Sequence, residues 1–243
     1  MADSLSADGP TVDRPLVHLS RGQLLPDDVL ARARSLPLKP SPVTLEGPSV
    51  RLVPLDLARH AEPLHAVSNG TPVSLVERRV EAYDADALIW RYMLGGPFAR
   101  VADLTAYLRD QVEAEHGLCL CVVHHPTGRP VGVVNYMNNA PAHLKVELGS
   151  IWYSPAVQRT GVNTEAISLL LQHAFALGYR RVEWKCDALN ERSRRAALRL
   201  GFTFEGIQEY HFMVKGRSRD TAWFRMLDHE WATVEKRLSR LLP

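Results

Sequence analysis

The chain has few cysteines, and their spacing is not that of metal ligands. Its 243 residues include only Cys119, Cys121 and Cys186, an odd number without any CxxC pair. Cys119 and Cys121 are expected on one face of one strand, too close in sequence to form a useful disulfide. The pattern argues against zinc and redox roles, and no metal is expected. It predicts that all three thiols are small buried apolar groups.

Long apolar runs and an excess of one charge are also missing. No uninterrupted apolar stretch approaches the roughly 18 to 20 residues that a membrane span needs. Lys plus Arg number 29 against 27 Asp plus Glu, and this net charge of +2 is too balanced for a typical nucleic-acid-binding protein. The opening MADSLSADGP lacks the basic and apolar layout of a signal peptide. We therefore expect a cytoplasmic protein without nucleic-acid or membrane partners.

The overall composition is that of an ordinary soluble globular protein. The composition is 46% hydrophobic and 23% charged, with 16 Pro and 15 Gly, which argues against a mainly disordered chain or a repeat solenoid. A chain of this length buries a sizeable core without disulfides. Residues 1–42 have weak hydrophobic periodicity and predict an extended arm with one short helix starting near Pro26. Residues 43–243 predict a single domain that includes a C-terminal helix.

Hydrophobic periodicity and turn signals predict the order of elements in that domain. Expected strands cover about 50–55, 118–125, 130–136, 145–153, 181–187, 202–214 and 222–227, and expected helices about 57–68, 101–115, 163–177, 190–200 and 228–241. The first strands form an antiparallel hairpin, and a strand-helix-strand-helix-strand unit follows. The fold class is therefore α/β (or α+β). Residues 69–100 are long and irregular enough to be a substrate lid.

The most informative stretch lies between the strand ending at Tyr153 and the helix from Asn163. A short turn with Gly161 at the head of a helix directs free backbone N–H groups outward, and the helix dipole adds positive potential. Arg159 contributes a positive charge at the rim. Such a site suits a pyrophosphate, although a glycine before a helix is more often only a turn. The stretch is neither a Walker loop nor a GxGxxG fingerprint.

These residues match a family. Gln158-Arg-Thr-Gly-Val-Asn resembles the Q/R-x-x-G-x-G/A coenzyme A loop of the GNAT acyltransferases (GCN5-related N-acetyltransferases). Asp187-Ala-Leu-Asn-Glu-Arg-Ser-Arg-Arg-Ala-Ala-Leu-Arg-Leu-Gly-Phe resembles the family's N-x-x-S-x-x-A…G-F helix, and Glu205-Gly206 with Gly216-Arg-Ser-Arg-Asp resembles its RimJ/RimL-like branch. The similarity is good over about 144–230 and looser over about 48–143. Asn163 departs from the family's Gly or Ala, so we expect the loop to persist with altered phosphate contacts.

The resemblance implies a mixed, mostly antiparallel central sheet flanked by helices, with splayed central strands that hold an acyl-CoA. The backbone of Ile151, Trp152 and Tyr153 would pair with the pantetheine arm. Asn190 would hydrogen-bond the pantetheine or cysteamine end. The amides expected to hold the pyrophosphate are those of Gln158, Arg159, Thr160, Gly161, Val162, Asn163 and Thr164.

The attack of an amine on a thioester requires a neutral nucleophile, so a carboxylate that takes up its proton assists. Glu147, at the start of the central strand, stands where the resemblance places an acid in many RimJ/RimL-like enzymes. The alternative is a structural strand glutamate paired with Lys145 or an arginine. Glu209, His211 and Asp220 are rival candidates, and for His211 a structural or substrate-lining role is favoured.

The departing thiolate also needs a proton. Many family members place a tyrosine in the helix after the Asn, but Ala197 occupies the matching position here. The RimL-like alternative is Ser193, whose hydroxyl one turn inside the helix could donate to the sulfur. A local cap, in which Ser193 bonds back to Asn190, explains the same residue equally well.

The resemblance therefore implies an acyl-CoA-dependent N-acyltransferase. It would transfer acetyl from acetyl-CoA to a primary amine by direct attack in a ternary complex, and the acceptor would be a protein N-terminus or a small-molecule amine. The alternative is a non-catalytic GNAT-fold module that binds an acyl-CoA or a partner. GNAT domains often form homodimers, and exposed edge strands and the last helix offer surfaces for one.

Overall fold

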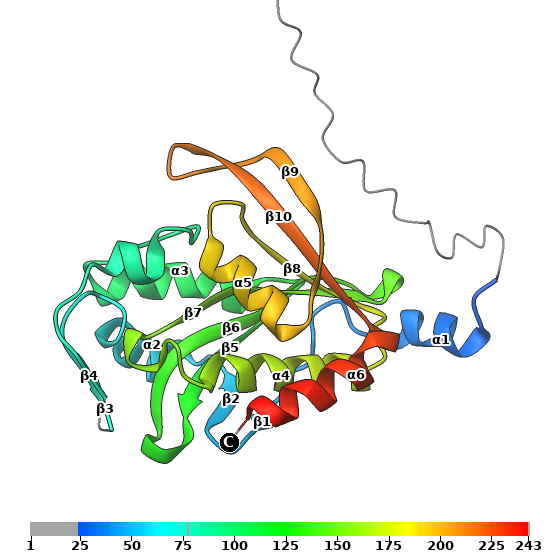
Figure 1. Cartoon of the computed structure of the whole chain (residues 1–243), viewed down its shortest axis with the longest axis horizontal. Coiled ribbons are helices and arrows are strands. Elements are labelled where there is room, and N and C mark those ends of the chain that lie inside the picture. The colour runs from blue at the N-terminus through cyan, green and yellow to red at the C-terminus, as the bar shows by residue number, and fades with distance from the viewer. Residues whose placement is uncertain (1–23, 77, 243) are drawn as a thin grey trace, which may run out of the picture.

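The structure, a computed structural model, describes residues 24–76 and 78–242 (Figure 1). It is built on one eight-stranded sheet with the strand order β1-β2-β5-β6-β7-β8-β10-β9. Neighbouring strands pair antiparallel except β7 and β8, which are parallel. The strands are β1 (Leu45–Glu46), β2 (Val50–Pro54), β5 (Leu118–His124), β6 (Arg129–Ala140), β7 (Lys145–Tyr153), β8 (Arg181–Asp187), β9 (Thr203–Val214) and β10 (Arg217–Leu227).

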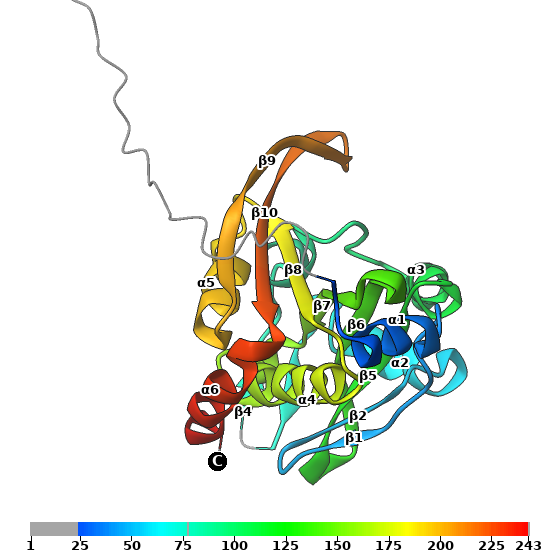
Figure 2. The same cartoon turned by 90° about the vertical axis from the view of Figure 1, so that its right-hand side faces the viewer.

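Helices cover both faces of this sheet. The helices are α1 (Asp27–Ser35), α2 (Leu57–Ala66), α3 (Val101–Glu113), α4 (Val162–Ala176), α5 (Glu191–Leu200) and α6 (Asp228–Leu238). Apolar residues of α4, α5 and α6 form the larger core cluster with one face, and those of α2 and α3 form a smaller cluster with the other. Figure 2 shows the far half of the β9–β10 hairpin arching over the side of the sheet that carries α3. The expected mixed, mostly antiparallel fold is confirmed.

Local signals explain why these segments form regular structure. Ile167, Leu170, Leu171 and Ala174 follow the helical period, and all four are fully buried in α4. The Asp56 side chain caps α2 by accepting hydrogen bonds from the amides of its first turn. None of the helices in the described stretches combines the length and apolar character needed to cross a membrane.

The segment expected to be irregular contains short elements that the sequence pattern missed. A two-stranded sheet pairs β3 (Val73–Leu75) with β4 (Arg78–Val80), and a single π-helical turn, η1, covers Asp86–Trp90. Trp90 is fully buried, and its indole N–H donates to the Ser68 carbonyl at 2.8 Å. Three-residue strands carry too little alternation to be recognised in a sequence, because they are fixed by what they pack against.

Part of the predicted N-terminal arm packs on the domain. The helix expected near Pro26 is α1, and Pro26 stands at its N-cap. Lys39 donates to the carbonyls of Val112 and Ala114 at 2.8 and 2.9 Å, which ties the following segment to the end of α3. The remainder of the predicted arm, residues 1–23, lies outside the described residues.

The prediction for the three cysteines is confirmed, since each is buried as a free thiol. Burial raises the pKa of Cys121 to about 12. It likewise raises the pKa of Cys119 and Cys186 above the ordinary thiol value. All three sulfurs are therefore protonated at neutral pH and unreactive.

A buried carboxylate joins α4 to the first strands. Glu165 is only 1% exposed, and its Oε1 accepts hydrogen bonds from the backbone N–H groups of Ser49 at 2.8 Å and Val50 at 3.0 Å. A Cβ on Gly47 would stand 2.2 Å from the same oxygen, so a glycine is required there. The contact fixes the start of β2 against the first turn of α4.

Replacing Glu165 with alanine is expected to lower the free energy of unfolding by about 2–4 kcal/mol, because two buried amides lose their acceptor and a cavity remains. Glu165→Gln keeps an acceptor oxygen in the same place, so it is expected to cost less than the alanine variant. Urea denaturation of both variants and the parent measures the difference. Equal stability of the alanine variant and the parent would remove this role for the carboxylate.

Candidate active site

The centre of the sheet opens between β7 and β8. Their parallel pairing runs from Lys145 opposite Arg181 to Leu148 opposite Trp184, and both strands then continue without pairing to each other. The register between β6 and β7 shifts after Val133, and Ser150 adopts a left-handed φ of 47°. Such a bulge bends a strand, so the far half of β7 turns away from β8. Splayed central strands are thus confirmed.

The edge of β7 that faces the opening belongs to Ile151, Trp152 and Tyr153. Trp152 and Tyr153 pair on their other side with Val133 and Gly132 of β6. Both aromatic side chains are buried, which fixes the backbone of this segment. Because neighbouring residues of a strand direct their backbone groups to opposite sides, only part of the backbone of this segment faces the gap.

The loop after β7 leads directly into α4. Arg159 takes a left-handed φ of 61°, and the Thr160 hydroxyl donates to the Val157 carbonyl at 2.6 Å, which folds the turn back on itself. Five backbone N–H groups of this loop donate to no acceptor within residues 24–76 and 78–242. They are those of Arg159, Thr160, Gly161, Asn163 and Thr164. Free amides at the positive end of a fifteen-residue helix form a site for an anion.

Two amides of the expected set are already bonded within the loop. The Gln158 N–H donates to the Pro155 carbonyl, and the Val162 N–H donates to the Thr160 hydroxyl, both at 3.3 Å. The Gln158 side chain instead bonds the carbonyls of Tyr153 and Leu88. Five of the seven expected amides therefore remain available to an anion, because Gln158 and Val162 use theirs within the loop.

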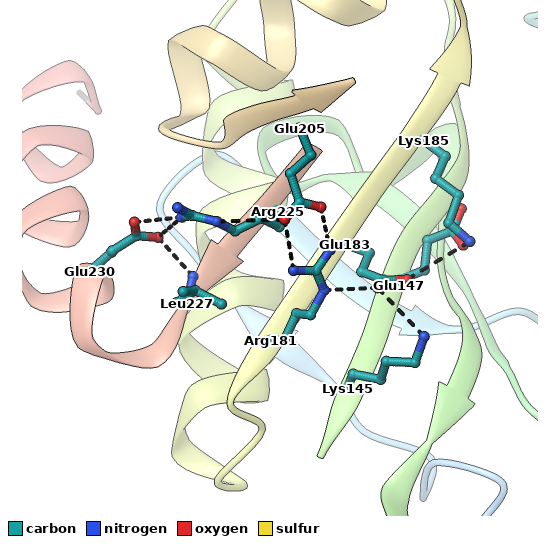
Figure 3. A network of polar contacts seen from close by, with 9 residues as sticks. All are labelled: Lys145, Glu147, Arg181, Glu183, Lys185, Glu205, Arg225, Leu227 and Glu230. Carbon is teal, nitrogen blue, oxygen red and sulfur yellow. Dashed lines mark hydrogen bonds and ion pairs between the residues drawn. The ribbon is translucent and has the colours of Figure 1, made fainter. Parts of the chain in front are cut away.

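Glu147 lies on β7 just before the strands separate. Its side chain is 6% exposed, and its Oε2 lies 2.7 Å from the Lys185 ammonium (Figure 3). The same oxygen accepts a hydrogen bond from the Asn138 amide at 2.7 Å. No donor in the described part of the chain contacts its Oε1. Glu147 is therefore in an ion pair, as the structural alternative expected, but its partner is Lys185 and not Lys145 or an arginine; Lys145 approaches Glu183 at 3.5 Å.

A chain of ion pairs continues from Glu147 across the same face of the sheet (Figure 3). Glu183 accepts from Arg181 at 2.8 Å, and Arg181 also pairs with Glu205. Burial alone would raise the pKa of Glu183, but the hydrogen bond from Arg181 and the charges of Lys145, Arg181 and Lys185 outweigh it and lower that pKa. Glu183 is thus ionised at neutral pH and matched by cations.

The three rival candidates for the general base, Glu209, His211 and Asp220, all lie on the β9–β10 hairpin. The Asp220 carboxylate accepts from the Tyr210 N–H at 2.8 Å, which is a structural role in the hairpin. Glu209 is exposed on β9. His211 stacks on Phe212 with ring centroids 3.8 Å apart and lies 5.8 Å from the Trp223 ring. None of the three contacts Glu147 directly in the described residues.

Asn190 and Ser193 stand at the start of α5, beside the end of β8. The Asn190 side chain accepts from the Ser193 backbone N–H at 3.1 Å and so caps the helix. The Ser193 hydroxyl does not bond back to Asn190; it accepts from the Trp184 indole N–H at 3.0 Å. A hydroxyl that accepts in this way keeps its own proton to donate. Ala197, one turn further, is fully buried.

A pocket of about 510 Å³ opens between α3 and the strands β6 and β7. Asn135 lies at its base, 3% exposed, and its amide donates to Gln111 of α3 and to the Ser150 carbonyl in the bulge. Asn138, which bonds Glu147, also lines this pocket. The pocket therefore meets the splayed strands on the face that carries Glu147.

The segment expected to be a lid crosses near the open end of the two strands. Carbonyls of η1 accept hydrogen bonds from three separate elements. Arg192 of α5 donates to Ala87 and Leu88, Gln158 also donates to Leu88, and Lys215 at the tip of the β9–β10 hairpin donates to Trp90 at 2.7 Å. These contacts hold η1 against the loop before α4, α5 and the hairpin.

Sequence reasoning missed Lys185 and Asn138. The available signal was Arg181-Val-Glu-Trp-Lys-Cys-Asp, in which charged residues alternate along a strand expected to be central. A charged face on a central strand requires partners or a ligand. The pattern did not say which neighbouring carboxylate each cation would meet.

Comparison with known proteins agrees with this geometry. A model of the acetyltransferase (GNAT) domain family matches residues 72–203. The crystal structure of a GCN5-related N-acetyltransferase from Brucella melitensis superposes with a TM-score of 0.75 at 37% identity, covering 84% of this chain and 87% of that one.

Two curated relatives from Escherichia coli K12 are more distant. Spermidine N(1)-acetyltransferase is 24% identical over 65% of this chain and 84% of its own length. A ribosomal-protein-serine acetyltransferase is 28% identical over 41% of this chain and 56% of its own length. With the splayed parallel strands and the loop at the head of α4, these matches show that the chain belongs to the GNAT family of N-acetyltransferases.

Proposed function

We propose that this protein transfers the acetyl group of acetyl-CoA to a primary amine by direct attack in a ternary complex. The observation that carries the proposal is the end of β7–β8 pairing at Leu148 and Trp184, directly beside a buried Glu147. The gap between the strands would admit the extended thioester arm of acetyl-CoA. The carboxylate at the point where the gap begins would take up a proton from the attacking amine.

The residues of the loop fit the acidic end of acetyl-CoA. Free amides of Arg159, Thr160, Gly161, Asn163 and Thr164 would hold the pyrophosphate at the head of α4. A Cβ built on Gly161 meets no protein atom within 4 Å, so the space beside this residue is open to a ligand. The unpaired edge formed by Ile151, Trp152 and Tyr153 would pair with the pantetheine arm, and the Asn190 amide would donate to its end.

Bound acetyl-CoA supplies an activated acetyl thioester. In the proposed reaction Glu147 accepts a proton from the acceptor amine through Oε1, while Lys185 and Asn138 hold Oε2. Ser193 donates its hydroxyl proton to the departing thiolate and regains a proton from solvent, with the Trp184 indole fixing its oxygen. Much of the rate would come from positioning the two substrates on rigid strands.

The names of the two curated relatives specify spermidine in one case and a ribosomal-protein serine in the other. Both proteins are acetyltransferases, which supports an amine acceptor for this chain without selecting between a small molecule and a protein N-terminus. The acceptor would reach Glu147 from the face lined by α3, η1 and the β9–β10 hairpin.

The proposal is tested by calorimetric titration with acetyl-CoA, followed by thiol release with a panel of amines. We expect saturable binding of one acetyl-CoA per chain and amine-dependent release of free coenzyme A. The absence of binding at millimolar acetyl-CoA would overturn the proposal. Binding without turnover of any amine or N-terminal peptide would instead favour the alternative, a non-catalytic acyl-CoA-binding module.

A further inference from the structure

Four buried polar atoms on the β9–β10 hairpin have no hydrogen-bond partner among the described residues. They are His211 Nδ1, Arg219 Nε, Thr221 Oγ1 and Trp223 Nε1. Thr221 as a whole is fully buried. A buried polar atom without a partner costs about 1–3 kcal/mol, so four in one small region are not explained by the needs of the fold.

The three of these atoms that belong to β10 are on side chains of the sheet face that carries Glu147. Trp223 stands opposite Lys185 in the β8–β10 register, with the lysine ammonium 4.1 Å from its ring centre. Thr221 stands opposite Asp187, and Arg219 follows two residues further along β10. Because alternate residues of a strand share a face, the three side chains lead from the Lys185–Glu147 pair toward the hairpin tip.

Arg219 differs from the other arginines around the opening. Arg181 and Arg225 pair with glutamates, and Arg192 and Arg194 donate to backbone carbonyls. Arg219 makes no hydrogen bond or ion pair with any residue in the described ranges. Its guanidinium carbon instead lies 5.4 Å from the ring centre of Phe212. An aromatic ring restrains the guanidinium plane and leaves its N–H groups available to an oxyanion.

We propose that the amine acceptor also carries an anionic group, a carboxylate or a phosphate, and that the Arg219 guanidinium binds it. This inference rests on the proposed function, since it places the reacting amine at Glu147. Four residues of extended strand span about 13 Å, and the Arg219 side chain reaches back over part of that length. The amine and the anion would therefore lie roughly 6–9 Å apart in the acceptor.

The competing acceptor class is a polyamine. Asp110 and Glu115 are exposed at the pocket beside α3 and would suit a second ammonium group. Both carboxylates are exposed and hydrated, however, so neither needs a ligand to replace a missing partner. The buried unpartnered atoms of the hairpin and the unpaired Arg219 favour an anionic tail over a cationic one.

The test uses three amines that share a six-carbon chain: 6-aminohexanoate, hexylamine and 1,6-diaminohexane. Each is titrated calorimetrically into the full chain saturated with coenzyme A, and each is assayed for thiol release with acetyl-CoA. We expect 6-aminohexanoate to bind at least about tenfold more tightly than the other two. Arg219→Gln is expected to abolish that preference, so that 6-aminohexanoate binds the variant no more tightly than hexylamine does.

The matched control is Arg217→Gln. Arg217 is an exposed arginine two residues nearer the hairpin tip, and it has no ion pair in the described residues, so its removal changes the net charge by the same amount without removing a buried polar atom. Titration of 3-aminopropyl phosphate and of its neutral counterpart 3-amino-1-propanol measures the preference for a phosphate. That preference is then compared with the preference for the carboxylate of 6-aminohexanoate. The control variant is expected to keep the preference for anionic amines within about twofold.

Two results would overturn the inference. One is equal or tighter binding of hexylamine or 1,6-diaminohexane, and the other is an unchanged preference in Arg219→Gln. Failure of the proposed function is a separate outcome, seen as no binding of acetyl-CoA. Titration of the three amines into the protein without coenzyme A still reports in that case whether Arg219 selects an anion.

Discussion

Replacing Glu147 with glutamine is expected to lower kcat by about 10²–10⁴-fold, the usual contribution of a general base. An alkylamine with a pKa near 10.4 is almost fully protonated at neutral pH, so a group that removes its proton governs the fraction able to attack. Glutamine keeps the shape of the side chain and can still accept from Lys185 and Asn138, but it cannot take up a proton. Thiol release at saturating concentrations of both substrates measures the loss.

The control for this variant is Glu183→Gln. Glu183 stands directly opposite Glu147 and is equally buried, but its nearest cations are Arg181 at 2.8 Å and Lys145 at 3.5 Å, and it approaches Lys185 only at 3.8 Å. We expect it to affect stability with a change in kcat below about threefold. Calorimetry should show acetyl-CoA binding to both variants as to the parent. Unchanged turnover of Glu147→Gln would remove the carboxylate from the mechanism.

Replacing Gly161 with valine is expected to weaken acetyl-CoA binding by at least about tenfold with little loss of stability. Gly161 has φ −67° and ψ −17°, values that any residue adopts, and its added Cβ meets no protein atom within 4 Å. Neither the backbone conformation nor the packing therefore requires a glycine. The branched side chain would fill the space beside the free amides, and the loss of a good N-cap residue costs about 1 kcal/mol.

Gly128 provides the opposite control. It also lies in open space, but it has φ 64° at the turn between β5 and β6. Gly128→Val is therefore expected to cost about 1–2 kcal/mol of stability through backbone strain and to leave acetyl-CoA binding unchanged. Thermal melting and calorimetric titration of both variants measure the two effects. If Gly161→Val binds acetyl-CoA as the parent does, the pyrophosphate lies elsewhere.

Several features of this protein were predictable from the sequence because their causes are local. Asn190 caps α5 with its own side chain, and Gly201 ends that helix with φ 100°. The helical period of apolar residues identified α4, and turn residues identified the two hairpins. The loop from Gln158 to Thr164 was found through its resemblance to a family motif, and the structure places it at the head of α4 as expected.

The arrangement around Glu147 was decided only by the tertiary structure. The alternation of residues along β7 fixes the face of the sheet on which Glu147 lies, but not the strand that becomes its neighbour. The parallel register with β8 brings Lys185 to it and gives Lys145 to Glu183. Lys145 was the nearer partner in sequence, and proximity along a strand did not predict the contact.

The same limit applies to the opening and to the hairpin. A period of two residues gives each strand an inner and an outer face, whereas the bulge at Ser150 and the unpaired edge after Leu148 arise from the fit of β7 between β6 and β8. The unpartnered Arg219 follows from the pairing of β10 with β8 and β9. The sequence alone determined the longer elements, their order and the family loop, because propensity, capping and turn chemistry act within a few residues. Partners, gaps and unpaired charges were decided by the tertiary structure, because they depend on strand register between distant segments.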